Sequence, residues 1–395
     1  MIIYIIANFT NSQTSRFIEL AKMFSFKGHD VTVITSDFSH TKKKMKDSMR
    51  QHEGFRTIYL HEPGYPNNVS IKRLFSHYCW GKEVASYLKK SERPDIIYYA
   101  VPSLTAGSKM VDYCKKNDVK LAIDIQDLWP EAFSLTIKNK ILCQAFKPME
   151  WLVNKIYGNA DLIVAVSDTY RDRGLKVNKK NKNGLTVFLG NNIEVFDRSK
   201  DAFRIEKPKN EFWMAYIGTI GYSYDIPCVM QALAICNDRG NIKKKIKFFV
   251  IGDGPFIEQY KQLARQLNID VVLTGGLTYE KMVGTMCSCD IVVNPIRKGA
   301  AQSITNKVGD YAFSGKAVIN TQECEEYRNL VETYKCGINC ECGNAEDVAN
   351  AIETFASNPI MCFEMGINQR KLGEEKFDRK YTYPLIINAV EKLKQ

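Results

Sequence analysis

Short apolar runs alternate with amphipathic stretches in each half of this chain, and this alternation constrains the fold more than any other feature. Strands that alternate with helices predict a parallel sheet covered by helices on both faces. In the first half, the runs that we predict as strands are residues 2–7, 31–35, 57–60, 96–100, 121–125, 162–166 and 185–189. The first predicted helix covers residues 14–27 and ends before Gly28, a common residue type at helix C-termini.

The pattern restarts after a polar segment, residues 195–211, which we interpret as an interdomain linker. Predicted strands then cover residues 213–217, 247–251, 271–274, 291–294 and 317–320, and predicted helices cover 226–237, 256–266, 279–287, 307–313 and 383–394. We therefore predict two Rossmann-like α/β domains, residues 1–195 and 210–375, with a C-terminal helix of about residues 378–395 that returns to the first domain. Ligands bind at the carboxyl ends of parallel strands, so we expect the domains to face each other across a central cleft.

Positive charge is concentrated in the first half of the chain. The net charge is +11, and residues 1–195 hold 29 Lys and Arg against 19 Asp and Glu. Such asymmetry favours an anionic partner, and a solvated basic surface that serves solubility is the alternative. The chain has neither an RNA-binding aromatic pattern nor a zinc-finger spacing, so we expect membrane contact and no nucleic acid.

The cysteines and the lengths of the apolar runs indicate the cellular compartment of the protein. Of the 12 cysteines, several lie in apolar runs, where thiols act as small hydrophobic groups in a reducing compartment: Cys79, Cys114, Cys143, Cys228 and Cys236. The clusters at 287–289 and 336–342 have no histidine at zinc-ligand spacing, so no metal site is expected. No run reaches membrane-spanning length, and we expect a cytoplasmic protein whose contact with the inner face of the membrane is peripheral.

Two glycine-rich turns follow predicted strands of the second domain. The first, Gly218, Thr219, Ile220 and Gly221, opens a helix, where glycine lets the backbone approach an anion and the first N–H groups are free. The second, Gly252, Asp253 and Gly254, follows the neighbouring strand and can receive a base or a ribose. An ordinary tight turn is the alternative reading of each.

The most informative segment is residues 294–320. Basic, amide and hydroxyl side chains precede a predicted helix there: Arg297, Lys298, Gln302, Ser303, Thr305, Asn306 and Lys307. Together they supply the positive charge and the directed donors that a nucleotide diphosphate needs, and a capped surface helix is the alternative. We expect this loop and the turn after Ile217 to meet in space, which requires Lys307 to lie close to Gly218.

Polar side chains also follow two strands of the first domain. Asp124 lies at the end of the strand at 121–125, and Asp127 and Glu131 follow it, where we expect substrate-contacting side chains. A carboxylate there can accept the proton of the acceptor hydroxyl or bind sugar hydroxyls, and capping of the next helix by Asp127 is the alternative. After the first strand, three residues have side chains suited to sugar hydroxyls: Asn8, Thr10 and Thr14. Helix capping by Thr14 or Ser15 is equally compatible with that loop.

These segments resemble the retaining glycosyltransferases of family 4, which have the GT-B fold, over almost the whole chain. The glycine turn at 218–221 and the G-x-G-P turn at 252–255 match, as does the A-x-x-G segment after Tyr311. The family's acidic pair, eight residues apart, falls on Gln302 and Asp310, so the first acid is replaced. The family's arginine after the glycine turn is also absent, so Arg297, Lys298 or Lys307 must supply the charge. We also expect Leu277 to contact the donor.

The D-L-W-P-E and S-x-x-N-K segments are similar to the subgroup that builds bacterial O-antigen and capsular polysaccharide, including L-fucosamine transferases. The resemblance implies a retaining hexosyltransferase without cofactor or metal, which moves a sugar from a UDP-linked nucleotide sugar to an undecaprenyl-diphosphate-linked saccharide. Lys307 and Asp127 would be catalytic, and Asp310 would hold the ribose. Residues 71–80 and 138–157 mix basic and bulky apolar side chains, as interfacial or as ordinary packed helices do.

Two other functions remain compatible with the sequence. A UDP-sugar 2-epimerase shares the two-domain architecture, although the chain has only five histidines and none lies in a motif loop. A non-catalytic nucleotide-sugar-binding subunit is favoured by Gln302 in place of the usual acid.

Overall fold

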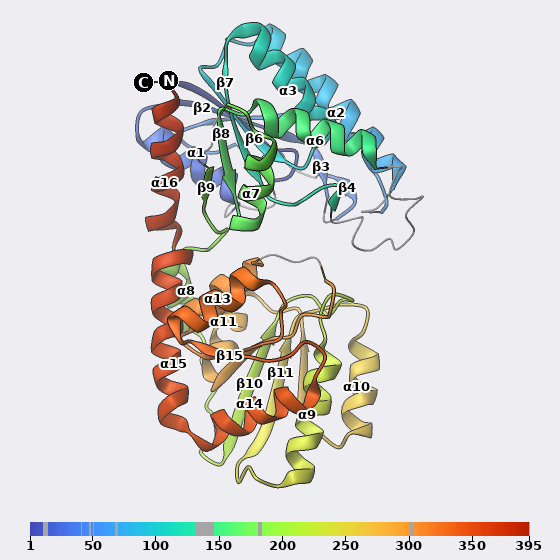
Figure 1. Ribbon diagram of the computed structural model, residues 1–395, viewed down its shortest axis with the longest axis vertical. Coiled ribbons are helices and arrows are strands. Elements are labelled where there is room, and N and C mark those ends of the chain that lie inside the picture. The colour runs from blue at the N-terminus through green and yellow to red at the C-terminus, as the bar shows by residue number, and fades with distance from the viewer. Residues whose placement is uncertain are drawn as a thin grey trace. The chain divides into compact units, whose positions relative to one another are not determined.

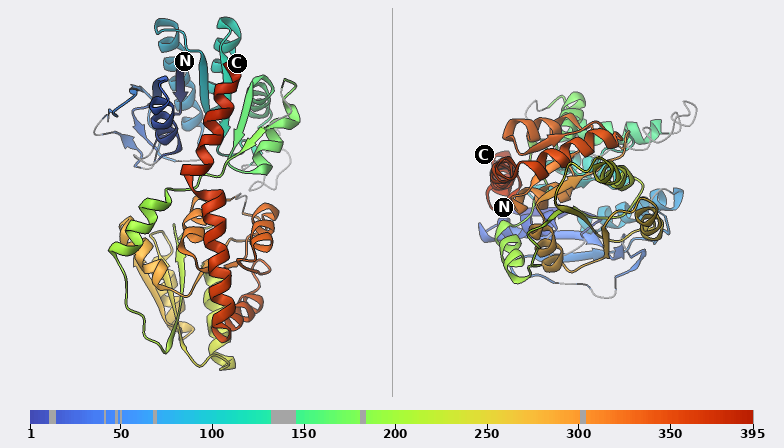
Figure 2. Two further views of the ribbon diagram at one scale, coloured as in Figure 1. Left: turned by 90° about the vertical axis from the view of Figure 1, so that its left-hand side faces the viewer. Right: turned by 90° about the horizontal axis from the view of Figure 1, so that it is seen from below.

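The computed structural model describes residues 1–10, 15–40, 42–46, 49, 51–67, 70–131, 146–180, 184–300 and 304–394. The chain forms two compact units, Met1–Val187 with Tyr383–Gln395, and Phe188–Thr382. Each unit is a parallel sheet with helices on both faces, as Figure 1 shows and as the further views in Figure 2 confirm. The predicted pair of Rossmann-like α/β domains is therefore confirmed.

The sheet of the first unit has the order β5-β2-β1-β6-β7-β8-β9, with parallel neighbours throughout. Its strands are β1 (Ile2–Ile6), β2 (Asp30–Ser36), β5 (Arg56–Leu60), β6 (Ile96–Val101), β7 (Lys120–Ile125), β8 (Leu162–Ala165) and β9 (Gly184–Thr186). A small antiparallel ribbon joins β3 (Phe38–Ser39) to β4 (Lys44–Met45). The helices are α1 (Arg16–Phe26), α2 (Ile71–Lys90), α3 (Leu104–Asn117), α6 (Lys147–Asn159) and α7 (Asp168–Val177).

The chain order of these strands reverses direction between β1 and β6, which makes this pair the topological switch point of the first unit. Strand β6 is buried along its whole length, as expected for a parallel sheet covered on both faces. The C-terminal helix α16 (Arg379–Glu391) buries Tyr383, Ile386, Ile387 and Val390 in the same core as Ile3 and Ile5.

The sheet of the second unit has the order β12-β11-β10-β13-β14-β15, again with parallel neighbours. Its strands are β10 (Glu211–Ile217), β11 (Lys245–Ile251), β12 (Val271–Gly275), β13 (Ile291–Asn294), β14 (Ala317–Asn320) and β15 (Gly337–Asn339). The switch point lies between β10 and β13.

The helices of this unit are α8 (Ile193–Ala202), α9 (Ile226–Arg239), α10 (Ile257–Gln266), α11 (Tyr279–Ser288), α12 (Asn306–Ser314), α13 (Glu325–Tyr334), α14 (Ala345–Ser357) and α15 (Pro359–Leu372). A π-helical turn, η1 (Gly373–Phe377), follows α15, and a short 3₁₀ turn, η2 (Lys392–Lys394), ends the described chain.

Alternate residues of the central strand β10 pack on opposite faces of the sheet. Met214 and Tyr216 lie in a core with α9 and α14, whereas Trp213 and Ile217 lie in a core with α11 and α12. This two-residue period explains why the strand reads as one uninterrupted apolar run in the sequence.

The interpretation of residues 195–211 as a linker was wrong for its first part, where helix α8 forms. Asn192 caps this helix by accepting a hydrogen bond from Val195 N at 3.0 Å. Phe196 is fully buried in the core of the second unit. The apolar side chains of α8 cluster in its first turn and charged ones follow, which gives little helical periodicity, so tertiary packing decides the helix.

The described cysteines are free thiols, and the expected burial of Cys114, Cys228 and Cys236 is confirmed, whereas Cys79 is half-buried. Cys143 lies outside the described residues. Within the described part of the chain, no helix combines the length with the apolar character that a bilayer crossing requires.

Candidate active site

Lys307 and Gly218 meet at the switch point of the second unit. Gly218 directly follows β10, and Lys307 lies in the first turn of α12, which follows β13. A Cβ atom placed on Gly218, whose φ is +124°, would lie 2.8 Å from Lys307 Nζ. The expected proximity of these two residues is therefore confirmed, and glycine is required at position 218 both by its backbone conformation and by this contact.

Two tyrosine rings hold the Lys307 ammonium group. Its Nζ lies 3.5 Å from the ring centre of Tyr224 and 4.4 Å from that of Tyr216, and it donates to Tyr216 Oη at 3.1 Å. Burial lowers the pKa of this ammonium group well below its usual range. Among the residues that the structure describes, no carboxylate forms an ion pair with it. Because burial disfavours its charged form, an anionic ligand that binds beside Nζ would favour protonation of this lysine.

The N-terminus of helix α12 adds donors beside Lys307. Thr305 is the N-cap residue, but its side chain makes no capping hydrogen bond. Thr305 Oγ1 is buried and has no hydrogen-bond partner within the described ranges. The first N–H groups of a helix lack intrahelical acceptors and carry a partial positive charge, so this end of α12 favours an anion.

The two glycine turns pack backbone to backbone. Ile220 N donates to Asp253 O at 2.8 Å, and Gly218 N donates to Ile251 O at 2.9 Å. A Cβ atom on Gly252 would lie 1.9 Å from Gly218 O, and one on Gly254 would lie 2.1 Å from Ile220 O. The alternative reading thus accounts for Gly252 and Gly254, because contact between the turns requires glycine at both positions whether or not a ligand binds.

The other side chains of the first turn differ in exposure, and that of Ile220, a predicted donor contact, is fully buried in the core. Thr219 is exposed, and its carbonyl oxygen accepts a hydrogen bond from Tyr216 Oη at 2.7 Å. A Cβ atom on Gly221 would meet only Thr219 Cγ2, at 3.6 Å. Tyr216 Oη thus links the Thr219 carbonyl group to the Lys307 ammonium group.

Asp310 lies one turn further along α12, in a polar network of its own. Its Oδ1 accepts hydrogen bonds from Tyr279 Oη at 2.9 Å and from Asn191 Nδ2 at 3.3 Å. Burial raises the pKa of this carboxyl group to about 6, although both hydrogen bonds oppose that rise. The sequence singled out Asp310 but not Tyr279, Asn191, Tyr216 or Tyr224, because no local spacing marks residues that converge from separate strands and helices.

The other donor-site candidates are less centrally placed. Arg297 and Lys298 are exposed, and the Arg297 backbone N–H donates to Ser223 O at 2.9 Å, which ties this loop to the first glycine turn. Leu277 is half-buried against the core, and Asn306 is an exposed first-turn residue of α12. Three candidates lie outside the described residues: Thr14, Gln302 and Ser303.

In the first unit, a polar cluster lies at the carboxyl ends of the strands. Asn8, which follows β1, has its Nδ2 3.3 Å from His77 Nε2. The His77 ring stacks on Trp129 with ring centres 6.0 Å apart, and Trp129 Nε1 donates to Asp127 Oδ2 at 3.2 Å. The candidates Asn8 and Asp127 are thus joined through two rings that the sequence did not single out. Burial raises the pKa of Asp127, which makes this carboxylate a better proton acceptor.

The expectation that Asp124 contacts a substrate was wrong. Its side chain is fully buried and forms an ion pair with Arg16 at 2.7 Å, and Tyr98 Oη donates to it at 2.6 Å. Asp124 lies inside strand β7, so its side chain points into the core. The two other first-unit candidates have protein partners: Glu131 pairs with Arg173, and Thr10 Oγ1 lies 2.9 Å from Thr35 Oγ1.

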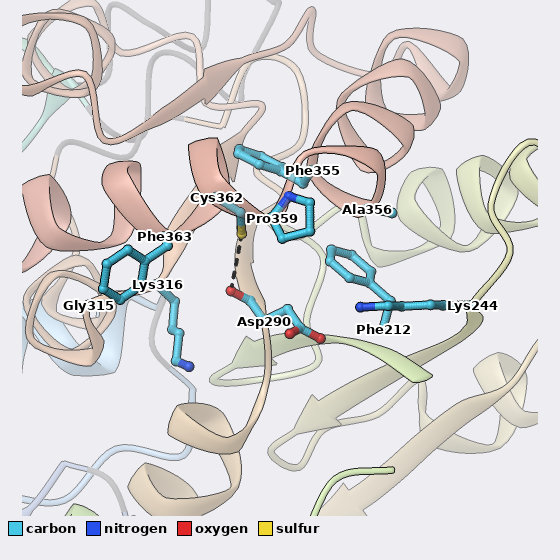
Figure 3. Close-up of a pocket in the computed structure, with 10 residues that line it drawn as sticks. All are labelled: Phe212, Lys244, Asp290, Gly315, Lys316, Phe355, Ala356, Pro359, Cys362 and Phe363. Atoms are coloured by element: carbon cyan, nitrogen blue, oxygen red, sulfur yellow. Dashed lines mark hydrogen bonds between the residues drawn. The ribbon is translucent and has the colours of Figure 1, made fainter. Parts of the chain in front are cut away.

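A pocket of about 170 Å³ lies at the opposite edge of the second sheet (Figure 3). It is lined near the amino ends of β10, β13 and β14 by Phe212, Asp290 and Lys316, and Cys362 Sγ lies 3.7 Å from Asp290 O. Ligands of such sheets bind at the carboxyl edge, so this pocket is separate from the candidate active site.

Comparison with known proteins matches one family model to each part of the chain. The model of glycosyl transferases group 1 matches residues 197–372, and the model of Glycosyltransferase Family 4 matches residues 13–182. No curated protein that was compared has significant sequence similarity.

Solved structures share the fold across the whole chain. Sucrose-phosphate synthase from Thermosynechococcus elongatus has 15% identity and a TM-score of 0.75, with 99% of this chain and 98% of that chain covered. Anabaena Alr3699/HepE in complex with UDP has 15% identity and a TM-score of 0.71, with 99% of each chain covered. WaaG, a glycosyltransferase involved in lipopolysaccharide biosynthesis, has 14% identity and a TM-score of 0.64, with 99% of each covered. This chain is thus a glycosyltransferase of the GT-B fold, with a family 4-type domain followed by a group 1 domain.

Proposed function

We propose that this glycosyltransferase moves a sugar from a UDP-linked donor to a lipid-linked saccharide, with retention of the anomeric configuration, during synthesis of a bacterial surface polysaccharide. The observation that carries the proposal is the Lys307 ammonium group, held on two tyrosine rings beside Gly218 at the switch point of the second unit. The structures of Alr3699/HepE with UDP and with UDP-glucose, and the part of WaaG in lipopolysaccharide biosynthesis, support the choice of substrates.

The leaving group explains why this arrangement suits the reaction. As the bond between the sugar C1 and the β-phosphate oxygen breaks, negative charge grows on the departing diphosphate. Lys307, Thr305 Oγ1 and the N-terminus of α12 stabilise that charge in the transition state more than in the ground state. Asp310 holds the ribose hydroxyl groups, and Leu277 and the 252–254 turn lie beside the nucleoside.

The acceptor hydroxyl forms the new bond to C1, on the face that the diphosphate leaves. Its proton passes to the departing phosphate oxygen, assisted by Asp127, whose pKa is raised by burial. Asn8 is placed to orient the acceptor saccharide through its side-chain amide.

Helix α2 provides the membrane contact that a lipid-linked acceptor needs. Ile71 is 85% exposed and Phe75 is 60% exposed, and Leu74 and Tyr78 continue the same stripe at helical spacing. Lys72 and Lys82 lie on the same helix. An exposed apolar stripe flanked by lysines is typical of helices that lie in the headgroup region of an anionic membrane.

The test is release of UDP from a panel of UDP-, GDP- and ADP-sugars, with and without a lipid-diphosphate-linked saccharide as acceptor. We expect UDP release that depends on the acceptor and forms a product with retained anomeric configuration. Release of a sugar isomer from the UDP-sugar alone, or nucleotide-sugar binding without any turnover, would contradict the proposal.

A further inference from the structure

Two cations of the first unit converge on one tyrosine ring. Arg73, on helix α2, has its Cζ 5.7 Å from the ring centre of Tyr65 and 4.3 Å from that of Trp129. Lys43 has its Nζ 4.7 Å from the ring centre of the same Tyr65. His40 completes the group, because its Nδ1 lies 2.5 Å from Tyr65 Oη and 3.4 Å from Lys43 Nζ.

The pKa shifts of these groups show that their positive charges destabilise one another. Burial, and after it the charges of Arg73 and Lys43, together lower the pKa of His40 to about 4. The pKa of Lys43 is also lowered, by burial and then by Arg73. Like charges that depress one another's protonation are relieved when an anion binds between them.

The backbone of Lys43 is unusual in a way that serves this convergence. Its φ is +55°, a conformation that non-glycine residues rarely adopt. It lies in the turn between β3 and β4, where its N–H donates to Ser39 O at 2.8 Å. Phe38 of the same ribbon packs on Tyr65 with ring centres 4.9 Å apart. The turn thus holds Lys43 over the ring at the expense of backbone strain, which is often found at ligand sites.

The carboxylates that face the cluster have other partners. Glu62 is buried and accepts a hydrogen bond from Ser76 Oγ at 2.9 Å, and burial raises its pKa. Asp127 accepts from Trp129, and Asp37 accepts from Glu62 N at 2.9 Å. Burial lowers the pKa of Arg73, and the charges of Asp127 and Glu62 act in the opposite direction, so both acids favour the protonated guanidinium group.

We propose that Arg73 and Lys43, supported by Tyr65, His40 and Trp129, bind the phosphate groups of a polyprenyl-diphosphate-linked acceptor. The assignment rests on the proposed function and names the part of the acceptor that this site reads. Guanidinium groups pair with phosphate oxygens in a fork, and a neighbouring ammonium group adds a point charge.

The exposed stripe of α2 explains why the phosphate would belong to a lipid. At about 100° per residue, Arg73 lies on the side of α2 that buries His77 and Trp80, opposite the apolar stripe, and the cation cluster and the stripe share the first turns of this helix. In a polyprenyl diphosphate, the phosphates join the hydrocarbon chain to the sugar. Helix α2, labelled in Figure 1, thus carries an apolar stripe for the hydrocarbon chain and a cation for the phosphates.

The experiment is calorimetric titration of the full chain with farnesyl diphosphate, in saturating UDP so that the second-unit site is filled. The variants are Arg73→Gln and Lys43→Gln, with Lys22→Gln as the control, because Lys22 is exposed and pairs with Glu19 on α1. We expect the Kd to rise about tenfold or more in both test variants, as for loss of a charge-assisted hydrogen bond, and to stay unchanged in the control. Unchanged affinity in Lys43→Gln and in a folded Arg73→Gln would overturn the proposal.

Three further arms identify the ligand and separate this site from the donor site. Farnesol lacks the phosphates, so its binding should be the same in all variants. Phosphatidylglycerol vesicles test an ordinary headgroup, and displacement of farnesyl diphosphate by these vesicles would overturn the assignment to the acceptor. Titration of Lys307→Ala should give the wild-type Kd for farnesyl diphosphate, and loss of binding there would mean that the ligand occupies the donor site. If the site binds farnesyl diphosphate but no transfer is found, only the proposed function fails.

Discussion

The two sheets follow the same strand order around their switch points, but their carboxyl edges carry different chemical groups. In the second unit the edge is glycine backbone, a helix N-terminus and one lysine held on two rings. In the first unit the edge is made of side chains, with stacked rings, cations and hydrogen-bonded acids. The difference fits the proposed substrates, because a diphosphate common to all nucleotide sugars can be held by backbone, whereas an acceptor needs side chains to be distinguished.

The largest effect should come from a residue that belongs to the core of the first unit and not to its ligand edge. Asp124→Asn leaves Arg16 as a buried charge without its carboxylate, which should lower the free energy of unfolding by about 4 kcal/mol. Asp127 lies only three residues along the chain from Asp124 but belongs to the ligand edge. Asp127→Asn should therefore change stability little and lower turnover instead. Urea denaturation of both variants checks the contrast, which fails if the two lose equal stability.

In the second unit, Lys307→Ala should remove about 3 kcal/mol of transition-state stabilisation and lower kcat by roughly 100-fold or more. The fold should persist, because the ring contacts of Lys307 contribute less than the surrounding core. Steady-state kinetics with Lys261→Ala as the control, an exposed lysine paired with Glu258 on α10, checks this. Turnover at the wild-type level in Lys307→Ala would rule out the phosphate role.

A substitution in the second glycine turn tests whether glycine at position 252 is required by packing between the turns. Gly252→Ala places a Cβ atom 1.9 Å from Gly218 O and should destabilise the protein by about 2 kcal/mol or more. Gly276→Ala has no atom within 4 Å and is the matched control, which should be neutral or slightly stabilising. Thermal unfolding of the two variants decides whether contact between the turns explains the glycine at 252.

The smallest effect should be a pH dependence that belongs to the second unit. Burial raises the pKa of Asp310 from 3.8 to about 6, so the folded state holds this proton more tightly than the unfolded state. The Asp310 contribution to the free energy of unfolding should therefore fall as pH rises from about 4 to about 6. Denaturant titrations across this range should show a flatter profile for Asp310→Asn, and an identical profile would contradict the raised pKa.

Much of this protein follows from local sequence patterns alone. Apolar periodicity located five of the six strands of the second sheet and four of the eight α-helices described in its unit, but it missed β15, α8, α13, α14 and α15. The turn glycines and Lys307 marked the edge where Gly218 and Lys307 meet. These features can be predicted because neighbouring residues determine a strand, a turn or the start of a helix.

Tertiary structure decided what those patterns could not. It separated Asp124, buried on Arg16, from Asp127, and it formed helix α8 around Phe196 in a segment that reads as a linker. It also brought Arg73 to Trp129 and Tyr224 to Lys307 from distant parts of the chain. Such convergence depends on strand order and on how helices pack, which involve contacts between residues far apart in sequence and leave no mark in any single stretch of it.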